Sequence, residues 1–487
     1  MTSISRRDVM KLGSGAGLAT AGSSMLMCTT ALMGSSAAVA AVGDDTSTPL
    51  GRLKVAARDS RQPVRSYDPL IVTQGQQNSA SPVMGAGAVV YPTPRGSAVN
   101  PNPVTLADLP QVWGFRRDTW TRQTGAGYIG ATIPGYGSWY VPIARVHRAQ
   151  TKTSNITCGL HFTLTGQAFE VLFAGTDARI TLVVDGKYMA YQNIATTSSG
   201  APLSNYNCFT RFDFGYRATR RISLYGWSTQ GACALAIAPG DQIEPWVRST
   251  SPSMCVMADS YGGARGANWN MGGPFFEAAA ALGIPHIDLN AIGGTGYAPN
   301  NTNDETRQPG NAFGPRLPDS VNAAPDLFFT AGGINDNNSF AAPPLYNSAA
   351  QALASFNNAV YGYYRSLRAS LPNSVLAAMG PWAPRESIPP NPVELSKLQT
   401  IRAALQSVGG PWIFLDNLNG GWSNSAGASS PATGRGWQTG TGKLDAPHGD
   451  GNADIYISAD GTHPTLAGCA YLGEVLASNL RAALLAL

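Results

Sequence analysis

The C-terminal half of the sequence alternates between short apolar runs and longer amphipathic stretches. Apolar runs typical of buried strands occupy residues 254–258, 286–289, 326–330, 375–379 and 412–415. Between them, apolar residues recur every three or four positions from Leu353 to Leu371, Asn391 provides an N-cap for a further helix, and a last helix is expected over residues 465–484. Because strand–helix alternation is typical of parallel sheets covered by helices on both faces, residues 249–487 are expected to form a three-layer α/β domain.

The preceding part of the chain has a different pattern. Residues 106–248 contain short runs of alternating polar and apolar residues, and Asp185 and Gly186 stand between two of them. An Asp-Gly pair in this setting predicts a tight hairpin. We therefore expect a β-sandwich, jelly-roll-like, over residues 106–248. Residues 41–105 are rich in Pro, Gly and Ser and are expected to form a linker or extended arm.

The first 40 residues are predicted to be an export signal. Residues 5–11 (SRRDVMK) form a twin-arginine signature, a weakly apolar stretch follows, and residues 38–40 (AVA) offer a cleavage site. The expected location is periplasmic or secreted. No later segment has the roughly 18 consecutive apolar residues of a membrane-spanning helix, so no stable membrane insertion is expected after cleavage. With a formal net charge of +4, and no basic run beyond the N-terminus, nucleic acid is not an expected partner.

Five cysteines remain after the predicted cleavage. Cys255 and Cys469 lie in apolar segments and are expected to be buried thiols. Cys158, Cys208 and Cys233 lie in the β-rich part and leave room for one disulfide. No spacing of cysteine and histidine typical of a metal site occurs, and neither a metal nor a cofactor is expected.

Residues that can provide a hydroxyl group, an amide or an accessible backbone N–H follow several of the predicted strands. Ser260 comes directly after the first apolar run, Gly293 and Gly294 follow the second, and Asn335 follows the third. The carboxyl ends of parallel strands meet at one edge of a sheet, where ligands bind. A serine hydroxyl, closely approaching backbone N–H groups and an amide donor are therefore expected at the same edge.

A pair of residues before the last helix supplies acid–base chemistry. Asp460 precedes His463 by three positions, so its carboxylate can accept the Nδ1 proton and leave Nε2 free to take a proton from a serine. Asp445 and His448 repeat this spacing, but they lie in a loop and lead into no helix. We favour His463. Asp450 and Asp454 resemble the start of a calcium loop but lack its later glycine and glutamate.

Four stretches in this order resemble the blocks of the SGNH (GDSL-type) hydrolase family. They are residues 258–261 (ADSY), 292–294 (IGG), 333–336 (GIND) and 460–463 (DGTH). The resemblance covers residues from about 252 onward and departs from the family at Ala258 and Tyr261, neither of which is expected to carry the reaction. It implies the family's flavodoxin-like sheet, a Ser260–His463–Asp460 triad, and an oxyanion hole formed by the N–H groups of Ser260 and Gly294 and the side chain of Asn335. Gly293 is the alternative to Gly294.

The resemblance implies an exported serine esterase. A β-sandwich ahead of such a domain is similar to the architecture of some carbohydrate esterases, so the expected substrate is an O-acetyl or other acyl ester on a carbohydrate, either a small molecule or a polysaccharide. The alternatives are a lipid or aryl esterase and a catalytically inactive carbohydrate-binding or assembly protein. The long loop over residues 417–456 is expected to form a rim of the cleft. Candidate substrate contacts are Arg265, Trp269, Asn270, Trp422 and Trp437.

Overall fold

In the computed structural model, the chain contains two sheets, one antiparallel and one mainly parallel. The structure describes residues 44–59, 70–74, 89–91, 120–124, 138–142, 154–157, 159–174, 179–189, 194–195, 207–226, 231–238, 240–245, 251–263, 273–298, 309–321, 324–336, 348–383 and 390–487. The predicted export signal over residues 1–40 lies outside this part of the chain. Among the described residues, no helix combines the length and the apolar character needed to cross a membrane.

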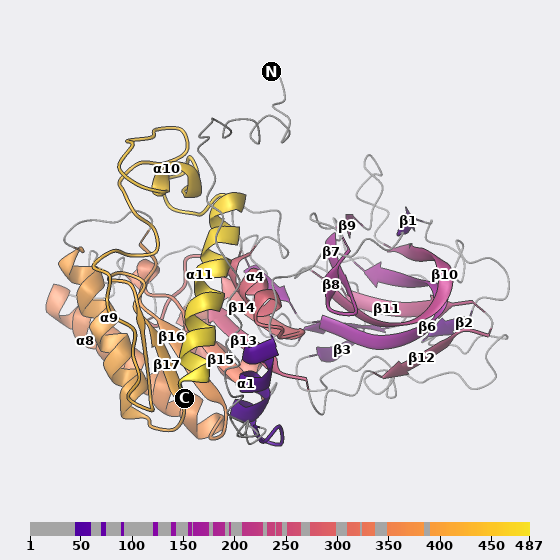
Figure 1. Ribbon diagram of the computed structural model, residues 1–487, viewed down its shortest axis with the longest axis horizontal. Coiled ribbons are helices and arrows are strands. Elements are labelled where there is room, and N and C mark those ends of the chain that lie inside the picture. Colours follow the sequence, from indigo (N-terminus) through magenta and orange to yellow (C-terminus); the bar gives the residue numbers. More distant parts are fainter. Residues whose placement is uncertain are drawn as a thin grey trace, which may run out of the picture. The chain divides into compact units, whose positions relative to one another are not determined.

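The C-terminal part of the chain is built on a seven-stranded sheet with the order β18-β17-β16-β15-β13-β14-β5 (Figure 1). Its parallel strands are β13 (Ser253–Ala258), β14 (His286–Ile292), β15 (Leu327–Ala331), β16 (Val375–Met379) and β17 (Trp412–Leu415). The antiparallel strands β18 (Trp422–Asn424) and β5 (Ser154–Thr157) lie at the two edges. Taken in chain order, the parallel strands have the order 2-1-3-4-5, which is flavodoxin-like, as predicted.

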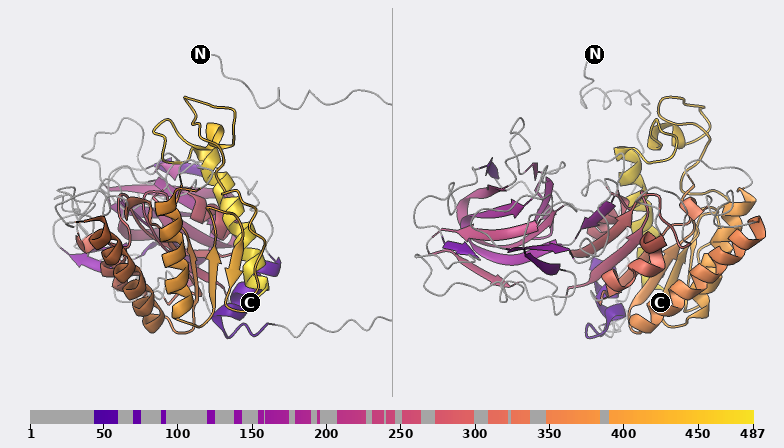
Figure 2. Two further views of the ribbon diagram at one scale, coloured as in Figure 1. Left: turned by 90° about the vertical axis from the view of Figure 1, so that its left-hand side faces the viewer. Right: turned by 180° about the vertical axis from the view of Figure 1, so that it is seen from behind.

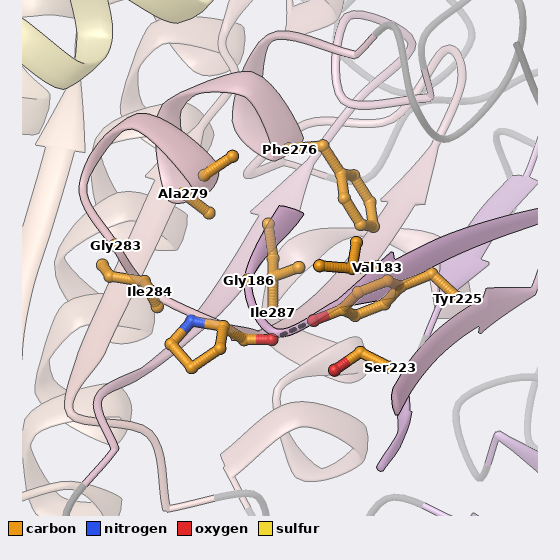
Figure 3. A pocket seen from close by; sticks show the side chains of 11 residues that line it. Val183, Gly186, Ser223, Tyr225, Phe276, Ala279, Gly283, Ile284 and Ile287 are labelled. Atoms are coloured by element: carbon orange, nitrogen blue, oxygen red, sulfur yellow. Dashed lines mark hydrogen bonds between the residues drawn. The ribbon is translucent and has the colours of Figure 1, made fainter. Parts of the chain in front are cut away.

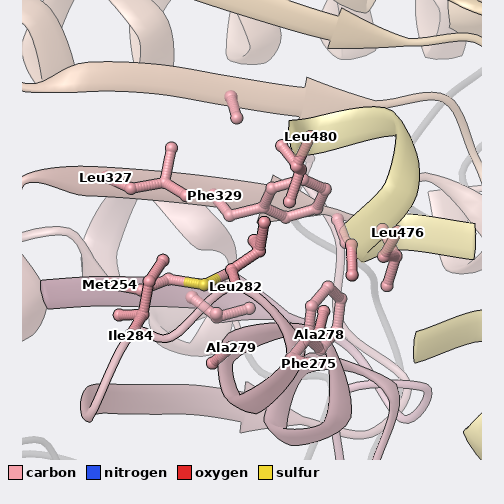
Figure 4. Packing of buried hydrophobic residues seen from close by; sticks show 14 of the residues in the cluster. Met254, Phe275, Ala278, Ala279, Leu282, Ile284, Leu327, Phe329, Leu476 and Leu480 are labelled. Carbon is pink, nitrogen blue, oxygen red and sulfur yellow. The ribbon is translucent and has the colours of Figure 1, made fainter. Parts of the chain in front are cut away.

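Helices cover both faces of this sheet, because alternate residues of each strand point to opposite sides. Met254 and Val256 of β13 belong to the apolar cluster under α4 (Pro274–Ala281) and α11 (Leu466–Leu485), which Figure 4 shows from close by. Cys255 and Met257 belong to the cluster under α8 (Ala349–Ser370) and α9 (Pro392–Ser407). The two groups of helices are seen on opposite sides in the left view of Figure 2. The predicted three-layer architecture is therefore confirmed.

Helix α9 begins where the sequence predicts, and both long helices of the second cluster have a side-chain N-cap. The side chain of Asn391 caps α9 by accepting a hydrogen bond from the N–H of Val393 at 2.9 Å, and Ser348 caps α8 in the same way. The shorter helical segments are α5 (Phe313–Arg316), α6 (Pro318–Val321), α10 (Ala453–Tyr456), η3 (Pro309–Asn311) and η4 (Ile334–Asp336).

Two segments assigned by the sequence to other regions belong to this α/β part. Residues 49–59 were expected to be linker but form helix α1 (Pro49–Asp59), whose Leu53 and Ala57 are buried in the cluster under α11. Arg52 of α1 pairs with Asp326 at 2.6 Å. Strand β5 comes from the predicted sandwich region and pairs with β14. Both corrections have the same cause: each segment is short, and its partners are distant in the sequence.

The other β-rich part is an antiparallel sheet with the main order β3-β4-β11-β6-β10-β7-β8. Two long strands, β6 (Gly159–Ala174) and β10 (Asn207–Gly226), pair along most of their length, and Phe162, Phe169 and Phe212 are buried against one another. The predicted hairpin at Asp185 and Gly186 is confirmed, since both have positive φ angles of 51° and 78° and β7 pairs with β8 around them. The remaining strands are β1 (Ile71–Gln74), β2 (Val89–Tyr91), β3 (Trp120–Thr124), β4 (Ser138–Pro142), β7 (Arg179–Val184), β8 (Lys187–Tyr188), β9 (Ile194–Ala195), β11 (Gly231–Ile237) and β12 (Gln242–Pro245).

Side chains of β7 and β10 meet α4 and the segment that leads into β14 around a small, mainly apolar pocket (Figure 3). The hydroxyl group of Tyr225 donates a hydrogen bond to the carbonyl of Pro285, and the ring of Tyr225 packs edge-on against Phe276. His161 and His286 are both buried, and their ring centres are 4.3 Å apart. Cys255 and Cys469 are buried thiols, as predicted. Cys158 and the side chains of Cys208 and Cys233 lie outside the described part.

Candidate active site

Ser260 lies on a tight turn directly after β13, the strand that pairs with both β14 and β15. The N–H of Tyr261 donates to the Asp259 carboxylate at 3.0 Å, and the N–H of Gly263 donates to the Asp259 carbonyl at 3.1 Å. At Gly262 an added Cβ would lie 2.4 Å from the Cβ of Ala258, so only glycine lets the turn fold back onto the strand. Ser260 is 7% exposed, which places its hydroxyl group at the end of a rigid strand close to the surface.

The strand order places Ser260 and Asn335 at the same edge of the sheet. The order reverses between β13 and β15, and open α/β sheets bind ligands at such a switch point, outside the carboxyl ends of the strands. Ser260 follows β13, and Asn335 lies in η4 just after β15. Gly294 follows β14, on the other side of β13. All three predicted positions therefore lie at the same edge of the sheet.

The turn that carries His463 is held together by the carboxylate of Asp460. One oxygen of Asp460 lies 2.6 Å from Nδ1 of His463, and the other accepts the N–H groups of His463 and Thr462, each at 2.9 Å. Burial alone raises the pKa of Asp460, but the hydrogen bonds from the His463 ring and from these N–H groups outweigh it and hold the pKa well below its ordinary value. Asp460 is therefore a carboxylate at neutral pH, placed to keep the proton of His463 on Nδ1.

Tyr261 joins the turn of Ser260 to the turn of His463. Its hydroxyl group donates a hydrogen bond to the carbonyl of Thr462, and its ring centre lies 5.9 Å from that of His463. On its other side the ring stacks on Trp382, with ring centres 4.6 Å apart and planes 8° from parallel. The residue next to the candidate nucleophile is thus in contact with the candidate base. Tyr261 and Thr462, which share the hydrogen bond, are 201 residues apart in the sequence.

The segment after β14 and the segment after β15 are also connected to each other. The side-chain amide of Asn335 donates to the carbonyl of Thr295 at 3.0 Å, which fixes the plane of the amide. The Asp336 carboxylate accepts the N–H groups of Tyr297 at 3.3 Å and Ala298 at 2.9 Å. Gly294 has a φ of 75°, a backbone conformation that residues other than glycine rarely adopt. Asn335 and Asp336 therefore tie the segment after β15 to the segment after β14.

Buried charged residues behind the site were not found from the sequence. Arg316 has no exposure and donates to the carbonyl of Ala258 and to the side chains of Asn290 and Thr295, so it connects the ends of β13 and β14. Lys397 is equally buried and donates to the carbonyl of Gly333 at 2.9 Å.

For Lys397 a signal existed, because it shares a helix face with Ile401 and Leu405 and follows Glu394 by three positions, and the two side chains pair at 3.1 Å. The sequence around Arg316 contains no comparable signal.

Burial also perturbs two carboxyl groups at this edge. It raises the pKa of Asp259 to about 7, with the charge of Asp336 adding to the effect and the N–H of Tyr261 opposing it. It raises the pKa of Asp336 to about 6, against the hydrogen bond from Ala298 and the charge of Lys397. Strongly shifted carboxyl groups are common at functional sites and also in structural networks. Because both groups bond backbone N–H groups, they are placed to support the turns.

The second Asp-x-x-His sequence does not form the same arrangement. Asp445 pairs with Lys443 at 3.1 Å, while Nδ1 of His448 lies 2.9 Å from the hydroxyl of Thr441. The carboxylates of Asp450 and Asp454 accept hydrogen bonds from groups of the same loop: from Thr441 for Asp450, and from the N–H groups of His448 and Gly449 for Asp454.

The candidate substrate contacts named from the sequence differ in where the structure places them. Trp437, a candidate substrate contact, is only 6% exposed and packs into the apolar cluster under α11, so little of its ring is accessible to a substrate. Trp422 lies in edge strand β18, is half-buried and packs against the same cluster. The sequence did not reveal this, because a tryptophan in a Gly/Ser-rich loop has no local pattern that distinguishes a buried from an exposed ring. Arg265, Trp269 and Asn270 lie outside the described residues.

The chain was compared with known proteins. No protein-family model matches it, and no curated protein matches its sequence. Among solved structures it is similar to the salicylyl-acyltransferase SsfX3 from a tetracycline biosynthetic pathway, with 14% identity and a TM-score of 0.47, over 82% of this chain and 98% of that chain. It is also similar to a family two carbohydrate esterase from Cellvibrio japonicus, with 12% identity and a TM-score of 0.42, over 86% of this chain and 99% of that chain.

A third similar structure is the acetyl xylan esterase Est2A from the rumen bacterium Butyrivibrio proteoclasticus. Identity is 13% and the TM-score is 0.44, over 75% of this chain and 95% of that chain. These likenesses concern the fold. The roles of individual residues in this chain follow from its own geometry.

Proposed function

We propose that this chain is a serine esterase in which Ser260 is the nucleophile, His463 the general base and Asp460 the group that orients His463. The observation that carries the proposal is the pair of connected turns. Asp460 lies 2.6 Å from Nδ1 of His463, and Tyr261, the neighbour of Ser260, contacts the same turn. A serine becomes an effective nucleophile only when a base takes its proton, so the pairing of these turns is the feature that the chemistry requires.

In the proposed reaction, Ser260 Oγ attacks the carbonyl carbon of the ester while its proton passes to Nε2 of His463, and the carbonyl electron pair moves to oxygen. The tetrahedral intermediate then expels the alcohol, which receives the proton from His463, and acyl-Ser260 remains. Water repeats the sequence: His463 removes its proton, the hydroxide attacks the acyl group, and the carboxylic acid leaves as Ser260 recovers its proton. The Asp460 carboxylate stabilises the imidazolium in both halves.

The negative oxygen of the intermediate needs donors that are in place beforehand. We assign this role to the N–H groups of Ser260 and Gly294 and to the amide of Asn335. The bond from Asn335 to the carbonyl of Thr295 supports the assignment, because it uses one N–H of the amide and orients the second. Removing one such donor typically lowers kcat by about 10²–10³. Gly293 remains the alternative to Gly294 as the backbone donor.

The proposed substrate is an O-acetyl or similarly small acyl ester on a carbohydrate. The four-block resemblance and the β-sandwich that precedes the α/β part support this class. A lipid or aryl ester is the competing substrate. The two are separated by measuring acetate release from a panel of acetylated glycans beside the hydrolysis of p-nitrophenyl esters of increasing chain length. Preference for the long chains would contradict the carbohydrate proposal.

A fluorophosphonate probe tests the esterase proposal itself, because it reacts only with an activated serine. The wild-type chain is expected to be labelled and to hydrolyse p-nitrophenyl acetate, and Ser260→Ala is expected to lose both properties. A wild-type chain that is folded, unlabelled and no faster than Ser260→Ala would favour the inactive carbohydrate-binding alternative.

We also propose that the chain is exported by the twin-arginine route to the periplasm or the medium. Arg6 and Arg7 at the start of the sequence support this. Fusing residues 1–45 to a reporter protein and replacing both arginines by lysine is expected to keep the reporter inside the cell. Export that persists unchanged would contradict this route.

A further inference from the structure

Tyr261 occupies a position that no step of the proposed reaction uses. It is fully buried, although it follows directly after Ser260 at the end of β13. Its ring stacks on Trp382 and also contacts the ring of His463, and its hydroxyl group donates to the carbonyl of Thr462. A turn residue at a sheet edge usually faces solvent, so this complete burial between two catalytic segments requires an explanation.

The turn of His463 is well bonded within itself. Asp460 accepts two N–H groups of the turn, and the N–H of Ser458 donates to the carbonyl of His463 at 2.8 Å. These bonds fix the shape of the turn and the orientation of the ring, but they do not fix how far the turn lies from Ser260. The hydrogen bond from Tyr261 to Thr462 joins the two turns, and the stacking of Tyr261 on Trp382 holds the phenol ring in place.

We propose that Tyr261 is a positioning residue that sets the separation between Ser260 and His463. The proposal rests on the esterase function proposed above. Because Tyr261 is covalently next to Ser260 and its hydroxyl group bonds the residue before His463, one rigid side chain spans the distance across which the serine proton moves. Transfer of that proton depends steeply on distance, so a small drift of the His463 turn lowers the rate without weakening substrate binding.

The hydroxyl group of Tyr261 remains a donor at every usable pH. Burial first, and then the charges of Asp259 and Asp460, raise the pKa of Tyr261 well above its ordinary value. A tyrosine that acted as a general acid or base would need a pKa near the working pH. The positioning role therefore predicts that replacing Tyr261 changes the height of the pH–rate profile and leaves its shape unchanged.

The test is the variant Tyr261→Phe, which keeps the ring on Trp382 and removes only the hydroxyl group. Tyr225→Phe is the matched control: Tyr225 is also buried and its hydroxyl group also donates to a backbone carbonyl, that of Pro285, but Pro285 lies just before β14, at the opposite edge of the sheet from Ser260. Both variants are assayed for kcat, KM, the rate of fluorophosphonate labelling and thermal stability.

For Tyr261→Phe, we expect kcat and the labelling rate to fall together by about tenfold, with KM within about twofold of wild type. Both variants are expected to lower thermal stability by a similar amount, because each loses one buried hydrogen bond. Tyr225→Phe is expected to leave kcat and the labelling rate within about twofold of wild type. Equal effects of the two variants on kcat would overturn the proposal, because the role of Tyr261 would then be structural alone. A changed profile shape would overturn it in favour of direct proton transfer.

The outcome is distinguishable from failure of the esterase proposal. If the wild type is not labelled at all, the function is wrong and the comparison does not arise. If the wild type is labelled and Tyr261→Phe is labelled equally fast, the function stands and the positioning role is wrong. Trp382→Phe adds an independent check: its effect on kcat is expected to be smaller in the Tyr261→Phe background than in the wild type, because both act through the same turn.

Discussion

Asp259, the residue before the proposed nucleophile, is a carboxyl group without exposure to solvent. Burial raises its pKa from 3.8 to about 7. Because the folded chain holds this proton more tightly than the unfolded chain does, the carboxyl contributes stability that is fully present below the unfolded pKa and is lost as pH rises through the folded pKa. The penalty on the native state of the wild type therefore grows from about pH 4 to about pH 7 and keeps its full size above that range.

Asp259→Asn removes this penalty and keeps an oxygen that can accept the N–H of Tyr261. The free energy of unfolding of the variant, taken relative to that of the wild type, is expected to increase by about 2 kcal/mol as the pH rises from about 5 to about 8. Urea unfolding at both pH values measures this difference. A difference between the two chains that is the same at both pH values would contradict the assigned shift.

The two Asp-x-x-His sequences allow a matched comparison at the same scale. Asp460→Asn places an amide beside Nδ1 of His463, so the ring can no longer rely on a carboxylate to hold its proton there. We expect kcat for p-nitrophenyl acetate to fall by about 10³–10⁴ with little change in the fold. Asp445→Asn removes only an exposed pair with Lys443 and is expected to leave kcat unchanged. A comparable loss in both variants would contradict the assignment of His463.

Among the elements, strands β13 to β17 and helices α8, α9 and α11 could be predicted from the sequence. Each carries its own signal, either an apolar run or apolar residues at helical spacing, and α9 has a capping residue as well. Because the polar residues of the site follow these strands directly, their meeting at one edge could be predicted too. The contact of Tyr261 with Thr462 could not, since nothing local to either residue indicates a partner so far along the chain.

Helix α1 marks the limit of such prediction at this scale. Leu53 and Ala57 are its buried apolar residues, and the surrounding Pro-, Gly- and Ser-rich sequence resembles a linker. Its stability comes from packing on α11: the carbonyl of Arg58 accepts a hydrogen bond from Arg481, and Leu53 lies in the apolar cluster beneath. Short helices are marginal in isolation and depend on such contacts.

Leu53→Ala therefore tests whether α1 is part of the core. Leu53 is 1% exposed, and removing a leucine from such a site typically costs about 2–5 kcal/mol. Leu466→Ala is the control, because Leu466 is 47% exposed at the start of α11 and its loss is expected to cost less than about 0.5 kcal/mol. Thermal or urea unfolding measures both. Equal stability of the two variants would show that residues 49–59 behave as the linker that their composition resembles.

At the scale of the whole molecule, the boundary suggested by the change of pattern near residue 249 does not separate two self-sufficient pieces. Strand β5 lies before that boundary and pairs with β14, and α1 lies before it and packs on the cluster under α11. The hydroxyl group of Tyr225 also bonds the carbonyl of Pro285. A chain that begins at residue 249 would lose all three contacts, leaving an unpaired strand at one edge of the sheet and exposed apolar side chains on one face.

We therefore expect a fragment of residues 249–487 to aggregate, or to unfold at least about 10 °C below residues 44–487, even though it contains every residue of the proposed triad. The longer fragment is the control, since it omits only Met1–Gly43. Both are compared by size-exclusion chromatography, circular dichroism on heating and fluorophosphonate labelling. A fragment of residues 249–487 that is monomeric, melts within a few degrees of the longer one and is labelled equally fast would mean that the contacts of α1, β5 and Tyr225 contribute little, and that the α/β part folds independently.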